Sequence, residues 1–250
     1  MFRNLIDNID NYSSEPDRFL DVPFVPSDEA VVDAMLALAN VGSSDLLYDL
    51  GSGDGRILIA AARERGARGI GVEVDPQLIA DSMEEAGAAR VEHLVDFIEE
   101  DIFDADCSAA TVVMLYLLES INLQLRPRLL DQLRPGTRIV SHAFDMGDWR
   151  ADDWIKMNGV NIYKWIVPAQ VAGNWEWTCH ESRSYRLELR QKFQDVTGKA
   201  WLDGVPAHLE ILSLNGSRLD LEICGKREAA QNELALFFDD GVLKSITAAE

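Results

Sequence analysis

The sequence predicts an α/β protein: a doubly wound parallel sheet followed by a small β-rich module. Between residues 46 and 144, five apolar runs of strand length alternate with segments that repeat apolar residues at helical spacing. Such alternation is typical of parallel strands joined by right-handed helical crossovers. Beyond Asp145 the helical spacing fades, and all six tryptophans lie in this last part of the chain. A change of architecture is therefore expected near that point.

Composition limits the partners. A chain of 250 residues can hold one large domain, or an ordinary domain with a smaller appendage. Acidic residues outnumber basic ones by 43 to 23, which gives a formal net charge of −20. A surface of this charge repels phosphate backbones, so no nucleic acid partner is expected. A basic protein or a small molecule is easier to accommodate.

Cysteine usage and hydropathy predict a cytoplasmic protein without a membrane partner. Cys107, Cys179 and Cys224 are far apart and form no C-x-x-C pair, so neither a disulfide framework nor a metal site is expected. The first residues lack the basic and then apolar pattern of a signal segment. The longest apolar run, 109–118, is about half of the ~20 residues that span a bilayer. The oligomeric state stays open.

The chain begins with a polar stretch, residues 1–21, which is expected to form a loose arm. The segment 22–27 is predicted to be extended, because each of its two prolines disfavours helix in the residue before it. Ser27 is then expected to cap a helix that continues to Gly42.

The first strand leads into a glycine-rich turn. Leu46 to Leu50 form an apolar run interrupted by Asp49, and Gly-Ser-Gly-Asp-Gly-Arg follows before an Ala-rich helix at 57–65. Glycines at alternate positions allow positive φ and let the backbone approach a ligand closely. The amides that open the helix are expected to be unpaired, and the helix dipole favours a carboxylate or phosphate there.

Two further acids follow the next strands. Glu73 ends the strand 69–73, about 20 residues beyond the glycine turn, where dinucleotide-binding folds place an acid on ribose hydroxyls. Asp75 and Pro76 begin a helix, a strand follows at 94–99, and Asp101 comes next with Ile102. Each acid alone would read as a solvated loop residue. Their order after the glycine turn favours a ligand site, in which Asp101 accepts a hydrogen bond from an adenine amino group.

The remaining strands of the first sheet are predicted at 111–116 and 138–144. Between them, 117–122 is expected to form a turn, followed by a helix that Pro127 starts or kinks. Ligands of such sheets bind beyond the carboxyl ends of the strands. The residues expected at this edge are Asp49, Glu73, Asp101, Tyr116 and Phe144.

The C-terminal part is predicted to be a β meander. Strands are expected at 162–167, 175–178, 185–193, 209–214 and 219–223, with a hairpin turn at Asn215 and Gly216. The first of these is expected to complete the first sheet as an antiparallel edge. The predicted domains are an arm (1–21), a binding domain (22–180) and a β module (181–250), with a boundary anywhere in 150–190. The tryptophans are expected to fill the core of the module or its seam.

The spacing of the glycines in the turn indicates which class of ligand it binds. It has the spacing G-x-G-x-G, whereas a nucleotide fingerprint has G-x-G-x-x-G. An amino acid moiety would place its carboxylate at the helix-start amides and its ammonium at Asp49. The pattern resembles the first motif of class I S-adenosylmethionine (SAM) dependent methyltransferases. SAM is the expected cofactor, held by Asp49, Gly51, Ser52, Gly53, Glu73, Asp101, Ile102 and Phe24. The alternative is a glycine-rich turn without a ligand.

Residues 22 to about 150 resemble bacterial relatives of the family that trimethylates lysine in mitochondrial proteins. The run from Thr111 through Asn122 to Ser141 also resembles, more faintly, the Dot1-type histone lysine methyltransferases. The resemblance implies a Rossmann-like fold, methyl transfer to a protein lysine, and an acceptor site in the segment 116–122. Tyr116, Glu119 and Asn122 are therefore the candidate catalytic residues.

Chemistry assigns further roles. A tyrosine or phenylalanine face would stabilise the sulfonium cation, which suits Tyr116 and Phe24. Glu119 or Asp145 could steer an ammonium into the site, and His142 is a candidate base. Two alternatives to a protein lysine methyltransferase stay open. One is a metabolite methyltransferase, and the other is a non-catalytic SAM-binding protein whose β module docks a partner.

Overall fold

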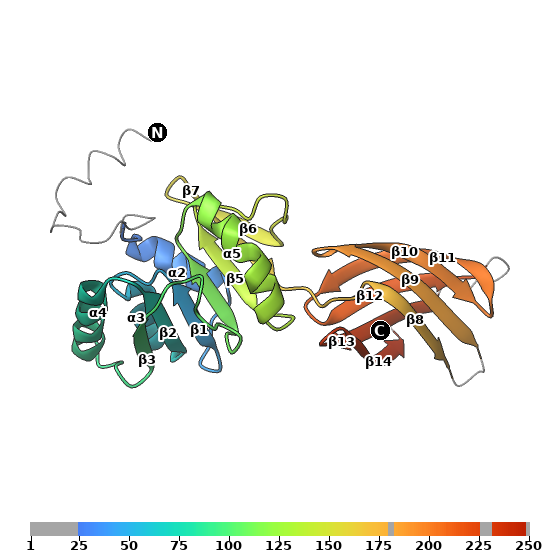
Figure 1. Ribbon diagram of the computed structural model, residues 1–250, viewed down its shortest axis with the longest axis horizontal. Helices are drawn as coiled ribbons and strands as arrows, with labels where there is room; N and C mark the ends of the chain where they lie inside the picture. Colours follow the sequence, from blue (N-terminus) through green and yellow to red (C-terminus); the bar gives the residue numbers. More distant parts are fainter. Residues whose placement is uncertain (1–24, 180–182, 226–231, 249–250) are drawn as a thin grey trace.

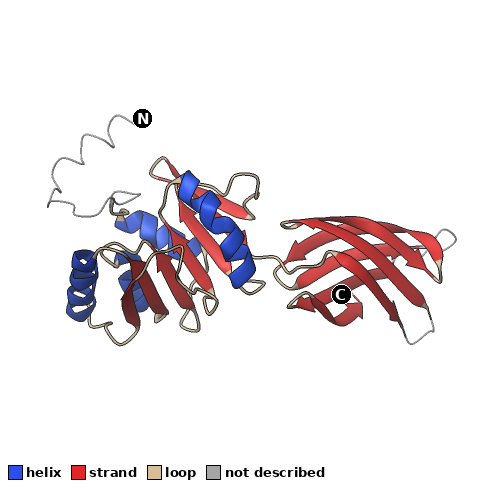
Figure 2. Ribbon diagram, viewed as in Figure 1, coloured by secondary structure: helices blue, strands red, loops and turns tan. Residues whose placement is uncertain are grey.

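The computed structural model describes residues 25–179, 183–225 and 232–248. The predicted arm and Phe24 lie outside these residues. Within them the chain forms two sheets of seven strands each (Figure 1). Helices accompany only the first of these sheets (Figure 2), as the predicted fold class requires. No helix of the described residues is long and apolar enough to cross a membrane.

The first sheet has the strand order 3-2-1-4-5-7-6. Strands β1 to β5 are parallel, and β7 is antiparallel to both of its neighbours. The order reverses between β1 and β4, which is the switch point where doubly wound sheets bind ligands. In spatial order the strands are β3 (Val95–Glu99), β2 (Arg68–Glu73), β1 (Leu46–Leu50), β4 (Val112–Leu115), β5 (Arg138–His142), β7 (Val160–Ile166) and β6 (Asp153–Met157).

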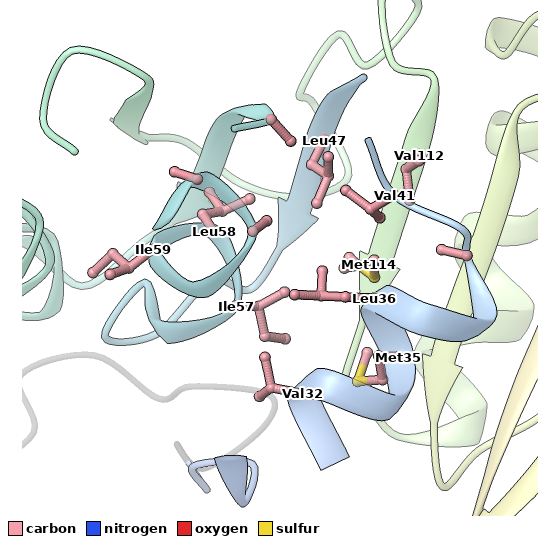
Figure 3. Packing of buried hydrophobic residues seen from close by; sticks show 14 of the residues in the cluster. Val32, Met35, Leu36, Val41, Leu47, Ile57, Leu58, Ile59, Val112 and Met114 are labelled. Carbon is pink, nitrogen blue, oxygen red and sulfur yellow. The ribbon is translucent and has the colours of Figure 1, made fainter. Parts of the chain in front are cut away.

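Both faces of this sheet are covered. Residues of α2 (Glu29–Leu38), α3 (Arg56–Arg65) and α4 (Pro76–Ala88) share one apolar cluster with alternate strand residues. Helix α5 (Glu119–Gln132) and the chain before β6 share the other cluster. Figure 3 shows Leu36 of α2 beside Met114 of β4 and Ile57 of α3. Because both faces are buried at the centre of the sheet, β4 is a continuous apolar run, whereas the edge strand β3 buries only Phe97.

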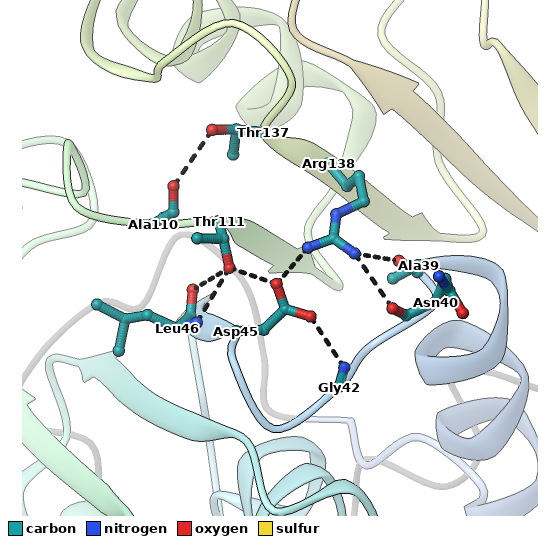
Figure 4. A network of polar contacts seen from close by, with 9 residues as sticks. All are labelled: Ala39, Asn40, Gly42, Asp45, Leu46, Ala110, Thr111, Thr137 and Arg138. Atoms are coloured by element: carbon teal, nitrogen blue, oxygen red, sulfur yellow. Dashed lines mark hydrogen bonds and ion pairs between the residues drawn. The ribbon is translucent and has the colours of Figure 1, made fainter.

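A buried polar network joins the amino ends of β1, β4 and β5 (Figure 4). Asp45 accepts hydrogen bonds from the Gly42 amide at 2.9 Å and the Thr111 hydroxyl at 2.7 Å, and it pairs with Arg138. Arg138 also donates to the carbonyl of Ala39 at 2.8 Å. Burial raises the pKa of Asp45, but these hydrogen bonds and the Arg138 charge outweigh it and lower the pKa. The network fixes the edge of the sheet opposite the ligand edge.

The second sheet is an antiparallel meander in sequence order. It curls, so that Trp175 on the first strand meets Phe238 on the sixth with ring centroids 5.0 Å apart. Its inner side chains form one apolar cluster. The strands are β8 (Gly173–Thr178), β9 (Ser184–Lys192), β10 (Asp195–Leu202), β11 (Val205–Asn215), β12 (Arg218–Cys224), β13 (Asn232–Asp239) and β14 (Val242–Ala248).

Two hairpin turns attach the second sheet to the first domain. At the β9–β10 turn, Phe193 stacks on the buried Trp149, with ring centroids 5.7 Å apart. Gln194 donates to the Arg150 carbonyl at 2.6 Å. At the β11–β12 turn, Gly216 accepts from the Ala169 amide at 2.8 Å. The first domain and the module are thus joined by contacts as well as by the chain.

Several predictions need correction. Ser27 does not cap α2, because Asp28 occupies that position. Segment 117–122 is not only a turn, because α5 begins at Glu119 and Pro127 lies inside it. The strand β6 was not expected. The second sheet begins at Gly173, before residue 180 but within the boundary range left open.

The tryptophans divide between the two parts. Trp165 is buried in the first domain, and Trp149 is buried there at the seam, one of the two predicted places, where it stacks on Phe193. Trp175 and Trp177 pack against the core of the module, as predicted. Trp154 on the edge strand β6 is 58% exposed.

Candidate active site

The glycine-rich turn is tied to the end of β2. Gly51, Gly53 and Gly55 have φ of 79°, 55° and 73°, the left-handed values that favour glycine. The amides of Gly51 and Ser52 both donate to the carbonyl of Val72, at 2.9 and 3.0 Å. The turn is therefore held against the neighbouring strand without any ligand.

Close packing explains the last glycine of the turn. A Cβ atom on Gly55 would lie 2.6 Å from the ring of Phe97 on β3 and 3.0 Å from the Ser82 side chain on α4. Ser82 also donates to the carbonyl of Gly53 at 3.0 Å. Side chains of β3 and α4 thus fix the shape of the turn.

Asp49 presents a buried carboxyl group at the end of β1. It is 3% exposed, and within the described residues no hydrogen-bond donor contacts its carboxyl oxygens. Burial raises the pKa of Asp49 well above its ordinary value, and the charges of Glu73 and Asp54 raise it further. A buried acid without a partner is costly to ionise. A cationic group placed beside it would remove this cost, which is the property expected of an ammonium site.

Glu73 is held by three backbone amides. Its Oε2 accepts from Gly53 at 3.0 Å, and its Oε1 accepts from Val74 at 2.9 Å and Asp75 at 3.1 Å. A carboxylate has about four acceptor positions, so capacity for ligand hydroxyls is left. Alternation along β1 and β2 places Asp49 and Glu73 on the same face of the sheet. The two acids expected to bind the cofactor therefore lie together.

The amides expected to be unpaired at the helix start lie one residue inside α3. The amides of Gly51, Ser52, Gly53, Gly55 and Arg56 all have acceptors within the protein. Only the next two helix amides, those of 57 and 58, have no acceptor in the described part of the chain. The buried Ser52 hydroxyl also has no partner there. A ligand carboxylate would therefore meet the first turn of α3 and the Ser52 hydroxyl rather than the glycine amides.

Asp101 and Ile102 lie in the loop that follows β3. Asp101 is exposed, and its Oδ1 accepts from the Phe103 amide at 2.9 Å. Ile102 is half-buried and packs against the cluster on the α5 face. Because β3 lies next to β2, this loop is on the Glu73 side of the turn. The order Asp49, Glu73, Asp101 along the chain thus becomes an order across the sheet.

Tyr116 lies on the same face as Asp49 and stacks on His142. The two ring centroids are 3.8 Å apart, with planes inclined by 26°. The Nδ1 atom of His142 lies 3.0 Å from the hydroxyl of Ser27. Burial raises the pKa of Tyr116 and lowers the pKa of His142 to about 4. Both rings are uncharged at neutral pH, and His142 is too weak a base to deprotonate an ammonium efficiently.

Asn122 and Glu119 lie on α5, which covers the opposite face. Asn122 is 0% exposed, and its amide nitrogen donates to the Ser141 hydroxyl at 3.2 Å and to the Phe144 carbonyl at 3.3 Å. Its Oδ1 has no partner in the described residues. Glu119 is exposed at the start of the helix. Asn122 therefore orders the chain after β5, and the structure does not bring it to Tyr116.

Sequence reasoning missed a clamp across the start of α2. Arg56 donates to the Ser27 carbonyl at 2.8 Å, and its guanidinium also bonds Asp54 at 2.9 Å. Arg56 stands where the nucleotide fingerprint has its third glycine, which was the available signal. A second missed feature is Ala143, whose φ of 69° directly after β5 redirects the chain toward Phe144 and Asp145.

The arrangement fits SAM. The buried Asp49 carboxyl, which has no donor among the described residues, suits an ammonium, and the Ser52 hydroxyl with the first amides of α3 suits a carboxylate. Glu73 has acceptor capacity for ribose hydroxyls, and the uncharged ring of Tyr116 suits a sulfonium. Bound SAM supplies an electrophilic methyl group.

Comparison with known proteins agrees with this assignment. The model of the ANTKMT methyltransferase domain matches residues 49–153. A protein-lysine N-methyltransferase of Saccharolobus islandicus is 39% identical over 151 residues, which are 58% of this chain and 94% of that protein. An adenine nucleotide translocase lysine N-methyltransferase of Mus musculus is 30% identical over 131 residues, 52% of this chain and 57% of that protein.

A solved structure is also similar. It is described as an RNA methyltransferase from Salinibacter ruber in complex with S-adenosyl-L-homocysteine, and it is 53% identical with a TM-score of 0.58. The match covers 59% of this chain and 96% of that chain. The predicted cofactor and reaction class are confirmed. The chain belongs to the family of SAM-dependent methyltransferases defined by the ANTKMT methyltransferase domain.

Proposed function

We propose that this protein transfers the methyl group of SAM to the side-chain nitrogen of a lysine in another protein. One observation carries the proposal: the protein-lysine N-methyltransferase of Saccharolobus islandicus matches this chain at 39% identity over 94% of its length. The chain's acidity supports it, because a protein with a formal charge of −20 attracts a basic acceptor.

The residues of the site divide into two groups. Asp49, Ser52 and Glu73 hold the donor, with the turn of Gly51 and Gly53 between them; Asp101 and Ile102 extend this set toward the adenine. Tyr116 is the residue of the acceptor segment nearest to them along the same face of the sheet. Its stacking on His142 fixes the ring, so its face and hydroxyl are held ready for a cation.

The acceptor ammonium must lose a proton before it can attack. Enclosure in a site with little water favours the neutral amine, because burial disfavours charge. Glu119 at the start of α5 and Asp145 after β5 carry the negative charges that would attract the incoming ammonium. Asp145 is already oriented by the Gly147 amide at 2.8 Å. Asn122 holds the Asp145 segment in place, which makes it a positioning residue.

RNA is the second candidate acceptor, because the 53% identical protein of Salinibacter ruber is described as an RNA methyltransferase. Binding RNA depends on basic side chains that neutralise phosphates. The chain has 23 basic residues against 43 acidic ones. The charge therefore favours a protein over an RNA acceptor.

We also propose that the protein works in the cytoplasm of a bacterium. The cysteines at 107, 179 and 224 are free thiols, which suit a reducing compartment. The similarity to a protein of Salinibacter ruber supports a bacterial source.

The test is incubation of the purified protein with methyl-labelled SAM and a bacterial lysate, followed by separate protease and ribonuclease treatment. Protease-sensitive label that maps to lysine by mass spectrometry is the expected result. Label removed only by ribonuclease would establish an RNA acceptor, and label in the small-molecule fraction a metabolite. Asp49→Asn is the matched inactive control, because it removes the ammonium partner without changing the shape of the side chain. SAM binding without label in any fraction would favour the non-catalytic alternative.

A further inference from the structure

The Tyr116 and His142 side chains meet because of the register between β4 and β5. The two strands are parallel and pair as far as Leu115↔Ser141. Tyr116 and His142 follow these residues directly, so they are neighbours on the same face of the sheet. Their ring centroids are 3.8 Å apart, with planes inclined by 26°. One face of the Tyr116 ring is therefore covered by an imidazole.

The other face of the Tyr116 ring lies on the side of the methyl donor. Strand β4 has β5 as one neighbour and β1 as the other, so the ring face turned away from His142 is on the β1 side. The strands β1 and β4 pair as far as Leu50↔Leu115, which places Gly51 beside Tyr116. Gly51 has no side chain that could fill this place. The half-buried ring thus lies between an imidazole and the switch point of the sheet.

The His142 ring is held by a residue from outside the sheet. Its Nδ1 atom lies 3.0 Å from the hydroxyl of Ser27, and both residues are buried. Burial lowers the pKa of His142 to about 4, although the charge of Asp28 opposes this shift. The imidazole is therefore uncharged at neutral pH and does not repel a cation on the far side of the Tyr116 ring.

Ser27 is itself fixed to the glycine-rich turn. Arg56 donates to the Ser27 carbonyl at 2.8 Å, and its Nε atom donates to the Asp54 carboxylate at 2.9 Å. Arg56 begins α3, and Asp54 lies in the turn. Contacts therefore run without a break from the donor turn through Ser27 and His142 to Tyr116. A ring held in this way needs little reorganisation when a ligand binds.

We propose that Ser27 and His142 are positioning residues that hold the Tyr116 ring for the sulfonium of SAM, so that the site discriminates the charged donor from its uncharged product. The face of an aromatic ring attracts a cation, and more strongly where water is excluded. The product, S-adenosylhomocysteine, has a thioether in place of the sulfonium but keeps the carboxylate, ammonium, ribose and adenine. The ring therefore stabilises the donor alone, whereas Asp49 and Glu73 bind donor and product alike.

This discrimination helps turnover. As the bond from the methyl carbon to the acceptor atom forms, the electron pair of the broken bond stays on the sulfur, and the positive charge passes to the acceptor. The attraction to the ring ends with that step. Product is then held only by the contacts that it shares with the donor, so fresh donor displaces it more readily. This role belongs to the donor side of the site and is the same for any methyl acceptor.

The test is calorimetric titration of the full-length protein with SAM and, separately, with S-adenosylhomocysteine. It needs no methyl acceptor, so its outcome is independent of the lysine assignment. The measured quantity is the ratio of the dissociation constant of SAM to that of S-adenosylhomocysteine. Tyr116→Leu should raise this ratio about five- to thirtyfold, the effect of a shielded cation–π contact. Tyr116→Phe should keep the parental ratio, because it retains the ring. An unchanged ratio in Tyr116→Leu would overturn the proposal.

Variants of His142 and Ser27 test the support of the ring. His142→Ala should raise the ratio about fivefold, because the Tyr116 ring regains rotational freedom. Ser27→Ala should raise it about threefold by removing the hydrogen bond, and it should have no further effect in a His142→Phe background, which lacks that bond already. Additive effects of these last two changes would show that Ser27 does not act through His142. Both of them preserve the packing, so they decide the matter even if His142→Ala fails to fold.

Two further variants separate the ring from other causes. Thr137→Val removes another buried hydroxyl, which donates to the Ala110 carbonyl at 3.2 Å at the amino end of the same sheet. It should leave the ratio unchanged, and a raised ratio would mean that general loosening of the sheet is the cause. Asp28→Asn removes the charge that acts on both rings. A larger effect of Asp28→Asn than of Tyr116→Leu would assign sulfonium recognition to that carboxylate and overturn the proposal.

Discussion

The two sheets of this protein have the same number of strands but bury them differently. The first buries both faces, one under α2, α3 and α4 and the other under α5. The second curls around a single apolar cluster and leaves its outer face in water. This difference in burial determines which surface of each sheet is available to a ligand or partner. A sheet covered on both faces offers its strand ends, whereas a curled meander offers the edges of its strands.

The largest effect should come from Asp49, where the first sheet places an acid at a strand end. Asp49→Asn should weaken SAM binding about thirtyfold or more, because loss of a buried charge partner costs about 2 to 5 kcal/mol. The unliganded variant should be as stable as the parent or more so, since the parent buries a carboxyl whose pKa is raised by burial and by the charges of Glu73 and Asp54. Calorimetric titration with SAM and thermal unfolding measure the two effects. Asp33→Asn, on the exposed side of α2, should change neither.

Asp49 also makes the free energy of unfolding depend on pH. Its pKa is raised in the folded protein, so the folded state keeps a proton that the unfolded chain has released. This group therefore contributes less stability as the pH rises from about 4, the ordinary carboxyl value, toward its raised value. The unfolding free energy of Asp49→Asn should lack this decline. A parent protein without SAM whose pH profile matched the variant would contradict the assignment.

The next effect concerns the amino ends of the strands in the first sheet. Arg138→Met should lower the free energy of unfolding by about 3 kcal/mol, because it leaves the Asp45 carboxylate buried without its charge partner. Chemical denaturation of the full chain measures the change. Adding Asp45→Asn to the variant should recover part of the loss. Full stability of Arg138→Met alone would mean that the hydrogen bonds from Gly42 and Thr111 suffice.

The smallest effect should appear at the seam between the two parts. Phe193→Ala removes the stacking on Trp149 and the contact with the Arg126 guanidinium, which lies 5.1 Å from the ring centroid. The loss should be about 1 kcal/mol, and the calorimetric unfolding transition should separate into two. Trp201→Ala is the control, because Trp201 carries Arg186 in a similar contact, 3.9 Å from the ring centroid, at the end of β10 away from the seam. That variant should lower the transition of the module alone.

Burial also decided which elements of the fold could be predicted from the sequence. A strand buried on both faces, such as Val112–Leu115, is a continuous apolar run that the sequence located. The edge strand Val95–Glu99 was also located, although only Phe97 is buried in it. The edge strand Asp153–Met157 was missed, because three of its five residues are exposed and no apolar run results. The start of α5 was missed because Leu118 stands at its N-cap and provides no capping side chain. Edges and caps carry weaker signals than buried strands.

The candidate site was predictable in its residues more than in its contacts. The spacing of Asp49, Glu73 and Asp101 identified the cofactor, and the family comparison confirms that cofactor. Which amides stay free could not be predicted, since the Val72 carbonyl and the Glu73 carboxylate reach the turn only through the tertiary fold. The role of Ser27 depended in the same way on His142, which is 115 residues away along the chain.

The contact between two glycines has a consequence for protein engineering. A methyl group on Gly216 would lie 3.0 Å from the Cα atom of Gly136, so the two turns meet without room for a side chain at Gly216. The meander thus meets the first domain through bare backbone at this point. Grafting it onto another methyltransferase would require transfer of the loop around Gly136 together with the strands. A fusion that kept only the linker would let the graft rotate freely.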